Sequence, residues 1–415
     1  MNRKSIGKRS IFGRALVICA ILVGLGILVF KFFEPVLIYK SGWAPFARID
    51  QSNVSFEAPS PAWKDAASAA NAALIKRYQK TENPALSAAV AIDGVLVWRG
   101  AIGYANIEAG SPIGVDDRFR LGSSSKPVTA IAIGTLLDAG KLDLDIPMIV
   151  VDPSLSDGMK SITLRQVMSH RAGIRDYGMC WCFPAWEHLN QRAFASVRDS
   201  VNVIDGDRLL SVLGKQYAYT SLGYNLAGLA VEKASGKTFQ SYLQTAIFDP
   251  LGMARSGLDS IPNGKSERVG FYDLENGQYK RAFAVNNSIW WPSGGILSTP
   301  GDMVRLGSAM LDNRLLSSAT RQKLVKVPLL GRSNGGEIYA LGWRVGDWTL
   351  PNRMVLKSYH HNGTAVGSTS VFVIFPEKKM VISVMANKGA EPTDELMATA
   401  DEIIMAFVAT LSIKK

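Results

Sequence analysis

The chain has 415 residues, of which 46 are Lys or Arg and 35 are Asp or Glu, so its formal net charge is +11. A hydrophobic fraction of 47% and a charged fraction of 20% are typical of globular proteins and exclude a disordered or fibrous chain. Three cysteines exclude a disulfide-stapled miniprotein and a four-thiolate zinc site, and the metal-ligand spacing H-E-x-x-H does not occur. The body of the chain has no basic run interleaved with aromatic residues, so we expect neither a metal nor nucleic acid to be bound.

The positive charge is concentrated at the N-terminus. Residues 1–40 carry seven Lys or Arg and one Glu, a net +6, whereas the remaining chain carries 39 basic and 34 acidic residues, a net +5. Residues 15–30 carry no charge, and Ile11–Phe33 would rise about 34 Å as a helix, enough to span a bilayer. We therefore predict a cytoplasmic basic head and a transmembrane anchor over residues 1–40.

The alternative for this segment is a cleaved signal peptide, but the bulky residues after the apolar run contain no small-residue cleavage site. The positive-inside rule then predicts a single-pass inner-membrane protein whose remaining chain lies on the extracytoplasmic side, the periplasm of a Gram-negative bacterium. Cys180 and Cys182 would lie in a compartment where disulfides persist. Their separation of two residues is awkward for disulfide geometry, so their pairing stays open.

The rest of the chain is predicted to comprise a linker over residues 41–63 and one folded domain over residues 64–415. Helical and alternating apolar patterns, with an Asp-Gly hairpin turn after the first strand, predict these elements: a helix Lys64–Thr81, strands Ala85–Ile92, Val95–Ile107, Ser368–Phe375 and Met380–Ala386, and a helix Asp394–Leu411. The middle of the domain shows helical periodicity. The predicted fold is α+β, an antiparallel sheet flanked by N- and C-terminal helices with a large, mostly helical insertion.

One candidate nucleophile lies where the helical middle begins. Ser123 and Lys126 form an S-x-x-K motif near a predicted helix start, and a spacing of three places both side chains on one helix face. A serine is a weak nucleophile unless its proton is taken up and its surroundings are positive, and a nearby ammonium and the helix N-terminus supply such surroundings. The same motif also occurs at Ser5 and Ser412, so the spacing alone is weak.

Three downstream stretches give the motif its context: Tyr217–Asn225 (YAYTSLGYN), Trp291–Thr299 (WPSGGILST) and His360–Thr364 (HHNGT). In this order they resemble the serine β-lactamase/penicillin-binding-protein family, whose three boxes are S-x-x-K, Y-x-N or S-x-N, and K-T-G. The resemblance is closest to the class C β-lactamase-related branch, which includes esterases, D-amino-acid peptidases and the mitochondrial serine β-lactamase-like protease. It covers roughly residues 64–411.

The resemblance implies a role for each matching residue. Ser123 would be the acylated nucleophile, Lys126 its activating cation and Tyr219 the general base. Because an ordinary phenol titrates near pH ~10, such a base would need nearby cations at neutral pH. Gly363 belongs to the third box, and the backbone N–H groups of Ser123 and Thr364 would form the oxyanion hole. No cofactor is implied.

Two positions depart from the β-lactamase pattern. Ser221 stands where asparagine is usual, and His361 stands where lysine is usual. Both changes disfavour β-lactam hydrolysis, because serine offers fewer hydrogen bonds than an amide and histidine is mainly neutral at pH 7. His361 would assist near the substrate or Tyr219, whereas His170 is expected to be structural, and Trp290 and Trp291 line a cleft or cover the core.

The predicted function is a membrane-anchored serine hydrolase that acts through a Ser123 acyl-enzyme on an ester, amide or peptide. Two alternatives remain: a D,D-peptidase or β-lactamase acting on cell-wall peptides or β-lactams, and a catalytically silent scaffold of the same fold. The expected partners are a small-molecule or peptide substrate and the membrane. The sequence leaves the natural acyl donor and the oligomeric state open.

Overall fold

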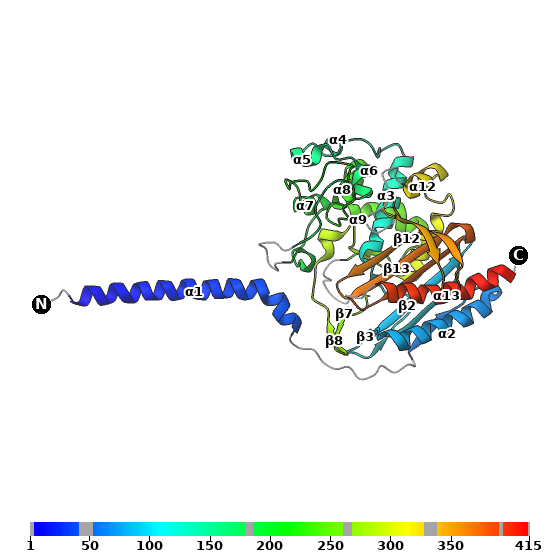
Figure 1. Cartoon of the computed structure of the whole chain (residues 1–415), viewed down its shortest axis with the longest axis horizontal. Coiled ribbons are helices and arrows are strands. Elements are labelled where there is room, and N and C mark those ends of the chain that lie inside the picture. Colours follow the sequence, from blue (N-terminus) through cyan, green and yellow to red (C-terminus); the bar gives the residue numbers. More distant parts are fainter. Residues whose placement is uncertain are drawn as a thin grey trace.

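The computed structural model describes residues 4–40, 53–178, 186–259, 268–327, 338–389 and 393–413. The pair Cys180 and Cys182 lies outside the described residues. Within them, a large antiparallel sheet is built from strands that lie close to both ends of the chain (Figure 1). Its strands are β1 (Val54–Glu57), β2 (Ala85–Ile92), β3 (Val95–Asn106), β4 (Ser111–Pro112), β10 (Ile338–Tyr339), β11 (Arg344–Thr349), β12 (Val355–Ala365), β13 (Ser368–Phe375) and β14 (Met380–Ala386).

The order of the strands joins the two ends of the chain in one sheet. The order is β1-β3-β2-β14-β13-β12-β11-β10, with β4 paired to β3. Strand β14 lies between β2 and β13 and is antiparallel to both, which confirms the predicted sheet. The turn between β2 and β3 places Asp93 at φ 51° and Gly94 at φ 80°, as a tight hairpin with two left-handed residues requires.

Both faces of the central strands are buried. On one face lie Leu86 and Val90 of β2, together with the helices α2 (Lys64–Thr81) and α13 (Asp394–Ile413). These two helices pack side by side in Figure 1. Ala89 and Ala91 alternate with those residues and join the core on the other face. The central strands are therefore buried along their whole length; α2 has the predicted bounds, and α13 ends two residues later than predicted.

The other face of the sheet carries a region of short helices. They are the helices α3 (Ser125–Asp138), α4 (Met148–Val151), α5 (Asp157–Lys160), α6 (Leu164–Met168), α7 (Val197–Val201), α8 (Asn225–Ser235), α9 (Phe239–Leu243), α10 (Asp249–Leu251), α11 (Pro300–Ala309) and α12 (Ser318–Val325), and the one-turn segments η2 (Gly122–Ser124), η3 (Glu187–Leu189), η4 (Gln244–Phe248) and η5 (Asn287–Trp290). Two further turns lie outside this region: η1 (Pro61–Trp63) leads into α2, and η6 (Pro376–Lys378) joins β13 to β14. The same part of the chain contributes the short strands β5 (Phe119–Arg120), β6 (Gly257–Leu258), β7 (Tyr272–Glu275), β8 (Gln278–Arg281) and β9 (Ile296–Ser298). The architecture is that of the predicted α+β fold with a mostly helical insertion.

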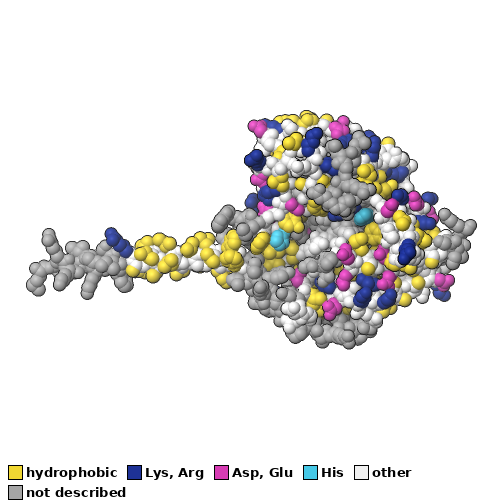
Figure 2. Space-filling view, in the orientation of Figure 1, with side chains coloured by type: hydrophobic (Ala, Val, Ile, Leu, Met, Phe, Trp, Pro, Cys, Tyr) yellow, Lys and Arg dark blue, Asp and Glu magenta, His cyan; other side chains and the backbone are white. Residues whose placement is uncertain are grey.

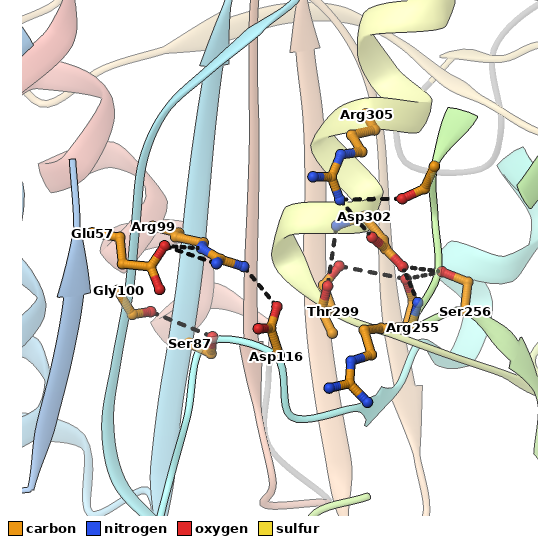
Figure 3. Close-up of polar contacts among 12 residues, drawn as sticks. Glu57, Ser87, Arg99, Gly100, Asp116, Arg255, Ser256, Thr299, Asp302 and Arg305 are labelled. Atoms are coloured by element: carbon orange, nitrogen blue, oxygen red, sulfur yellow. Dashed lines mark hydrogen bonds and ion pairs between the residues drawn. The ribbon is translucent and has the colours of Figure 1, made fainter. Parts of the chain in front are cut away.

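Helix α11 lies directly on the sheet, against β2 and β14. Its start is capped by the Thr299 side chain, which accepts a hydrogen bond from the Asp302 N–H at 3.1 Å. The Asp302 carboxylate in turn accepts from the Ser256 hydroxyl at 3.0 Å and from the Arg255 N–H at 2.9 Å, as Figure 3 shows. These contacts tie the start of α11 to the segment around Ser256 within the insertion.

The predicted linker contributes more structure than expected. Strand β1, inside residues 41–63, pairs with β3 at the edge of the sheet. Arg99 of β3 holds it there through an ion pair with Glu57 at 2.7 Å, and the same guanidinium contacts Asp116 at 2.6 Å (Figure 3). The prolines around this segment predict an extended chain, and an extended chain can also pair with a free sheet edge.

Helix α1 (Lys4–Lys40) is the N-terminal element. Its segment Gly13–Glu34 has a mean hydropathy of 2.7, and none of it is buried inside the protein. Figure 2 shows hydrophobic side chains along this helix, whereas basic and acidic side chains are interspersed on the visible face of the globular part. By length and composition α1 can cross a membrane, a property that membrane anchors share with signal sequences.

Candidate active site

Ser123 lies in the tight turn η2, immediately before α3. The turn requires a glycine at position 122, where φ is 52° and a Cβ atom would lie 2.6 Å from the Thr364 carbonyl oxygen. The predicted helix start is therefore confirmed, with a short turn inserted ahead of the helix. Lys126 follows in the first turn of α3, so its side chain reaches back to Ser123.

Serine hydroxyls fasten the Ser123 turn to the central sheet. The Ser124 hydroxyl donates to the His361 carbonyl oxygen of β12 at 2.9 Å, and the Ser370 hydroxyl of β13 donates to the Leu121 carbonyl oxygen at 2.7 Å. A Cβ atom at Gly363 would lie only 2.8 Å from the Ser124 nitrogen, so the close approach of β12 requires a glycine there too. The third box therefore lies beside the turn that carries Ser123.

Two side chains meet at the Ser123 hydroxyl, one from the first turn of α3 and one from a segment almost a hundred residues downstream. The Lys126 ammonium nitrogen lies 3.1 Å from Ser123 Oγ, and the Tyr219 hydroxyl donates to the same oxygen at 2.9 Å. Tyr219 comes from the loop that leads into α8. The structure thus brings together the serine, the lysine and the tyrosine that sequence reasoning selected, at hydrogen-bonding distances suited to proton transfer.

Lys126 is fully buried within a shell of oxygen atoms. Besides Ser123, its nitrogen donates to the Ser221 hydroxyl at 3.3 Å and to the Ser293 carbonyl oxygen at 3.1 Å. Burial lowers the pKa of Lys126 to about 7, with Asp176 opposing and Arg344 reinforcing the shift. In a substantial fraction of the molecules, Lys126 is therefore a neutral amine at pH 7 and can accept a proton.

The pKa of Tyr219 shifts in the direction opposite to the one that a phenolate base would need. Burial raises the pKa of Tyr219 above its usual value, although the hydrogen bond to Ser123 and the charge of Arg344 act against this rise. The guanidinium carbon of Arg344 lies 6.0 Å from the tyrosine ring centre. The effect of the nearby positive charge is thus smaller than the effect of burial, so the hydroxyl stays protonated and donates to Ser123.

His361 makes contacts that sequence reasoning did not anticipate. Its ring is fully buried, and its Nδ1 lies 2.7 Å from the Asn362 carbonyl oxygen, which can only accept a hydrogen bond. Nε2 is therefore the acceptor for the Tyr339 hydroxyl at 2.9 Å. Burial, together with the charges of Arg344 and Lys126, keeps the pKa of His361 well below its usual range. Both nitrogens are engaged within the protein rather than turned toward a substrate.

The sequence motifs missed several neighbours of the site. Asp176 accepts a hydrogen bond from the Ser221 N–H at 2.8 Å, and Arg344 lies opposite His360 in the β11–β12 pairing. Ser293 contributes a backbone carbonyl, which no side-chain pattern can reveal. Trp290 is buried, and Trp291 is partly exposed and donates to the Asp259 carbonyl oxygen at 3.3 Å. Among the described residues, no group of three His, Cys, Asp or Glu side chains could hold a metal ion.

Comparisons with known proteins agree with this geometry. The mitochondrial serine beta-lactamase-like protein LACTB of Homo sapiens is 28% identical over 384 residues, which cover 71% of this chain and 69% of that protein. The esterase EstB of Burkholderia gladioli is 30% identical over 189 residues, 42% of this chain and 46% of the esterase.

The solved structure of the D-amino acid amidase from Ochrobactrum anthropi SV3 complexed with D-phenylalanine has the same fold. It matches with a TM-score of 0.71 at 20% identity, over 83% of this chain and 99% of the amidase. The model of the Beta-lactamase family matches residues 71–405, which include all the boxes described above. With this match across most of its length, the chain belongs to the β-lactamase family of serine hydrolases.

Proposed function

We propose that this protein is a membrane-anchored serine hydrolase that cleaves an ester, amide or peptide substrate through an acyl-enzyme on Ser123. The observation that carries the proposal is the pair of hydrogen bonds to Ser123 Oγ, from Lys126 at 3.1 Å and Tyr219 at 2.9 Å. A positioned base and a positioned acid at one serine oxygen are what acyl transfer needs. We assign the hydrolase domain to residues 64–415, with strand β1 of the preceding segment added to its sheet and the anchor ahead of both.

In acylation, the neutral amine of Lys126 takes the Ser123 proton while Oγ attacks the substrate carbonyl carbon. The backbone N–H groups of Ser123 and Thr364 stabilise the oxyanion, and this assignment is supported by the close approach of Gly122 to the Thr364 backbone. When the intermediate collapses, Tyr219 gives a proton to the leaving group and the Lys126 ammonium restores it. Water then attacks the acyl-enzyme by the same route, releasing the acid and free Ser123.

The pH dependence of acylation follows from the Lys126 assignment. With the pKa of Lys126 lowered to about 7, the reactive neutral amine gains population as the pH rises through 7. We expect kcat/KM for p-nitrophenyl butyrate to fall about tenfold per pH unit below that inflection and to level off above it. A profile that stays flat between pH 5 and pH 9 would contradict Lys126 as the proton acceptor.

The substrate preference should favour uncharged esters over β-lactams. β-Lactams carry a carboxylate, and His361 is a buried neutral ring where a β-lactamase offers a lysine. Ser221 accepts a hydrogen bond from Lys126 and lacks an amide with which to hold a substrate. Losing one charge-assisted contact costs about 1–2 kcal/mol, which lowers kcat/KM by roughly five- to thirtyfold.

The test compares kcat/KM for p-nitrophenyl butyrate with that for a cephalosporin on the same preparation. We expect the ester to be the better substrate by at least about tenfold. His361→Lys should not narrow the gap, because it would bury a charge among residues that cannot solvate it, and its melting temperature should fall. If the cephalosporin were the better substrate of the wild type, the β-lactamase alternative would take first place.

The proposed location is the inner membrane, with the hydrolase domain on the periplasmic side. The apolar segment of α1 and the basic residues ahead of it support this orientation. A C-terminal alkaline phosphatase fusion should be active and sediment with membranes, whereas a C-terminal fluorescent reporter that folds only in the cytoplasm should stay dark. The opposite pattern would reverse the orientation, and a processed soluble product would identify a signal peptide.

A further inference from the structure

His170 lies below the proposed active site and has an unusual backbone conformation. It follows α6 with φ at 56°, in the left-handed region, where histidine is less disfavoured than most residues. Its side chain is fully buried. A non-glycine residue keeps this conformation only where contacts with the surrounding structure hold it there.

The two hydrogen-bond acceptors of His170 hold the peptide groups on both sides of Tyr219. The His170 carbonyl oxygen accepts from the Ala218 N–H at 2.8 Å, and ring Nδ1 accepts from the Thr220 N–H at 3.2 Å. One residue thus fixes the backbone just before and just after the catalytic phenol. His170 adopts the left-handed conformation, and in it both the carbonyl oxygen and the ring contact the segment 218–220.

The ring of His170 also packs directly against the phenol. Its centre lies 4.2 Å from the Tyr219 ring centre with an angle of 39° between the planes, and 4.6 Å from the ring centre of Tyr339. Tyr339 in turn donates to His361, so the imidazole is enclosed by side chains of the same site. Packing and hydrogen bonding therefore both act on Tyr219.

We propose that His170 is the positioning residue for Tyr219, and that it holds the phenol against Ser123 through the hydrogen bond from the Thr220 N–H to Nδ1. This inference rests on the proposed function, since it assigns a task within the same site. His170 touches neither Ser123 nor a reacting atom, and it acts through the segment 218–220.

The hydrogen bond requires a neutral ring. Burial, with the charges of Lys126 and Arg344, keeps the pKa of His170 well below its usual range, so Nδ1 stays an acceptor at neutral pH. The ring proton is then on Nε2, which is buried and has no hydrogen-bond partner among the described residues. Of the two ring nitrogens, Nδ1 is therefore hydrogen-bonded to the Thr220 N–H, whereas Nε2 is left without a hydrogen bond to any described residue.

Two substitutions separate the acceptor from the ring. His170→Asn keeps an acceptor in the place of Nδ1 and suits the left-handed backbone, but it removes the ring. His170→Phe keeps a ring of similar size and removes the acceptor, leaving the Thr220 N–H buried without a partner. If the acceptor positions Tyr219, His170→Asn should keep kcat for p-nitrophenyl butyrate within about fivefold of the wild type, whereas His170→Phe should lose ~30- to 100-fold.

KM should stay within about threefold in both variants, because neither removes the groups that meet the substrate. The reverse order, with His170→Phe active and His170→Asn impaired, would overturn the hydrogen-bond assignment in favour of ring packing. Should His170→Phe fail to fold, His170→Asn decides the matter by itself, since a loss of ~30-fold or more in kcat contradicts the proposal.

A double-mutant cycle shows whether His170 acts through Tyr219. In a Tyr219→Phe background the phenol that His170 positions is already gone, so adding His170→Phe should lower kcat by less than about threefold. An equal loss in both backgrounds would reduce His170 to a general structural role. Ser123→Ala serves as the separate control: if it keeps activity, the proposed function fails, and if it alone is inactive while His170→Phe matches the wild type, only this inference fails.

Discussion

Ser123→Ala should abolish labelling by a fluorophosphonate and lower kcat for p-nitrophenyl butyrate by ~10⁴-fold or more. The Ser123 hydroxyl is the shared partner of Lys126 and Tyr219, so its removal leaves both groups with nothing to activate. Losing one partly exposed hydroxyl should change the free energy of unfolding by about 1 kcal/mol at most. Thermal melting should therefore show a folded protein.

The matched control for this variant is Ser412→Ala, because Ser412 begins another S-x-x-K match, at the end of the chain. It should label and hydrolyse like the wild type. Persistent labelling of Ser123→Ala would remove Ser123 as the nucleophile, whereas loss of labelling in Ser412→Ala would mean that the motif had been assigned to the wrong place.

Lys126→Met and Lys126→Arg should both lower kcat by ~10²- to 10⁴-fold, for different reasons. Methionine removes the amine, whereas arginine keeps a positive charge but cannot be deprotonated and therefore cannot take the Ser123 proton. If Lys126 acted only as a fixed cation, as sequence comparison implied, Lys126→Arg would keep much of the activity. The decisive measurement is the acylation rate of the two variants beside the wild type.

The stability of Lys126→Met supplies an independent check. The pKa of Lys126 is lowered to about 7 from a usual value of 10.5, so the unfolded chain binds more protons than the folded protein between these pH values. The contribution of Lys126 to the free energy of unfolding should therefore be least favourable below pH 7 and should rise between pH 7 and pH 10. Methionine should raise the melting temperature more at pH 6 than at pH 9, and equal shifts would contradict a depressed pKa.

The sequence predicted those elements of the fold whose patterns are local. β2, β13 and β14 have the predicted bounds, because an Asp-Gly turn and alternating apolar residues mark them, while β3 ends one residue earlier than expected. Strand β1 was missed because a short extended segment near prolines becomes a strand only by pairing with β3. The helical middle was predicted as a class, but its many short helices depend on contacts between distant segments.

In the candidate site, too, the sequence predicted the residues that local motifs mark and missed those that only the fold brings close. Ser123 and Lys126 are three residues apart at a predicted helix start, which places both side chains on one face, and the order of the boxes selects this copy of the motif together with Tyr219. The sequence does not reveal a backbone carbonyl such as that of Ser293 or the charge that Arg344 brings from β11. The direction of the Tyr219 pKa shift was also missed, since burial depends on the complete fold.

The most direct test of the account is to trap the acyl-enzyme itself. The purified chain would be mixed with excess p-nitrophenyl butyrate, quenched in acid within the first turnover, digested and mapped by mass spectrometry. We predict one butyryl group per chain, on the peptide that contains Ser123, and none on Ser123→Ala treated in parallel. A butyryl group on another residue, or turnover with no acylated peptide at any quench time, would contradict the central claim.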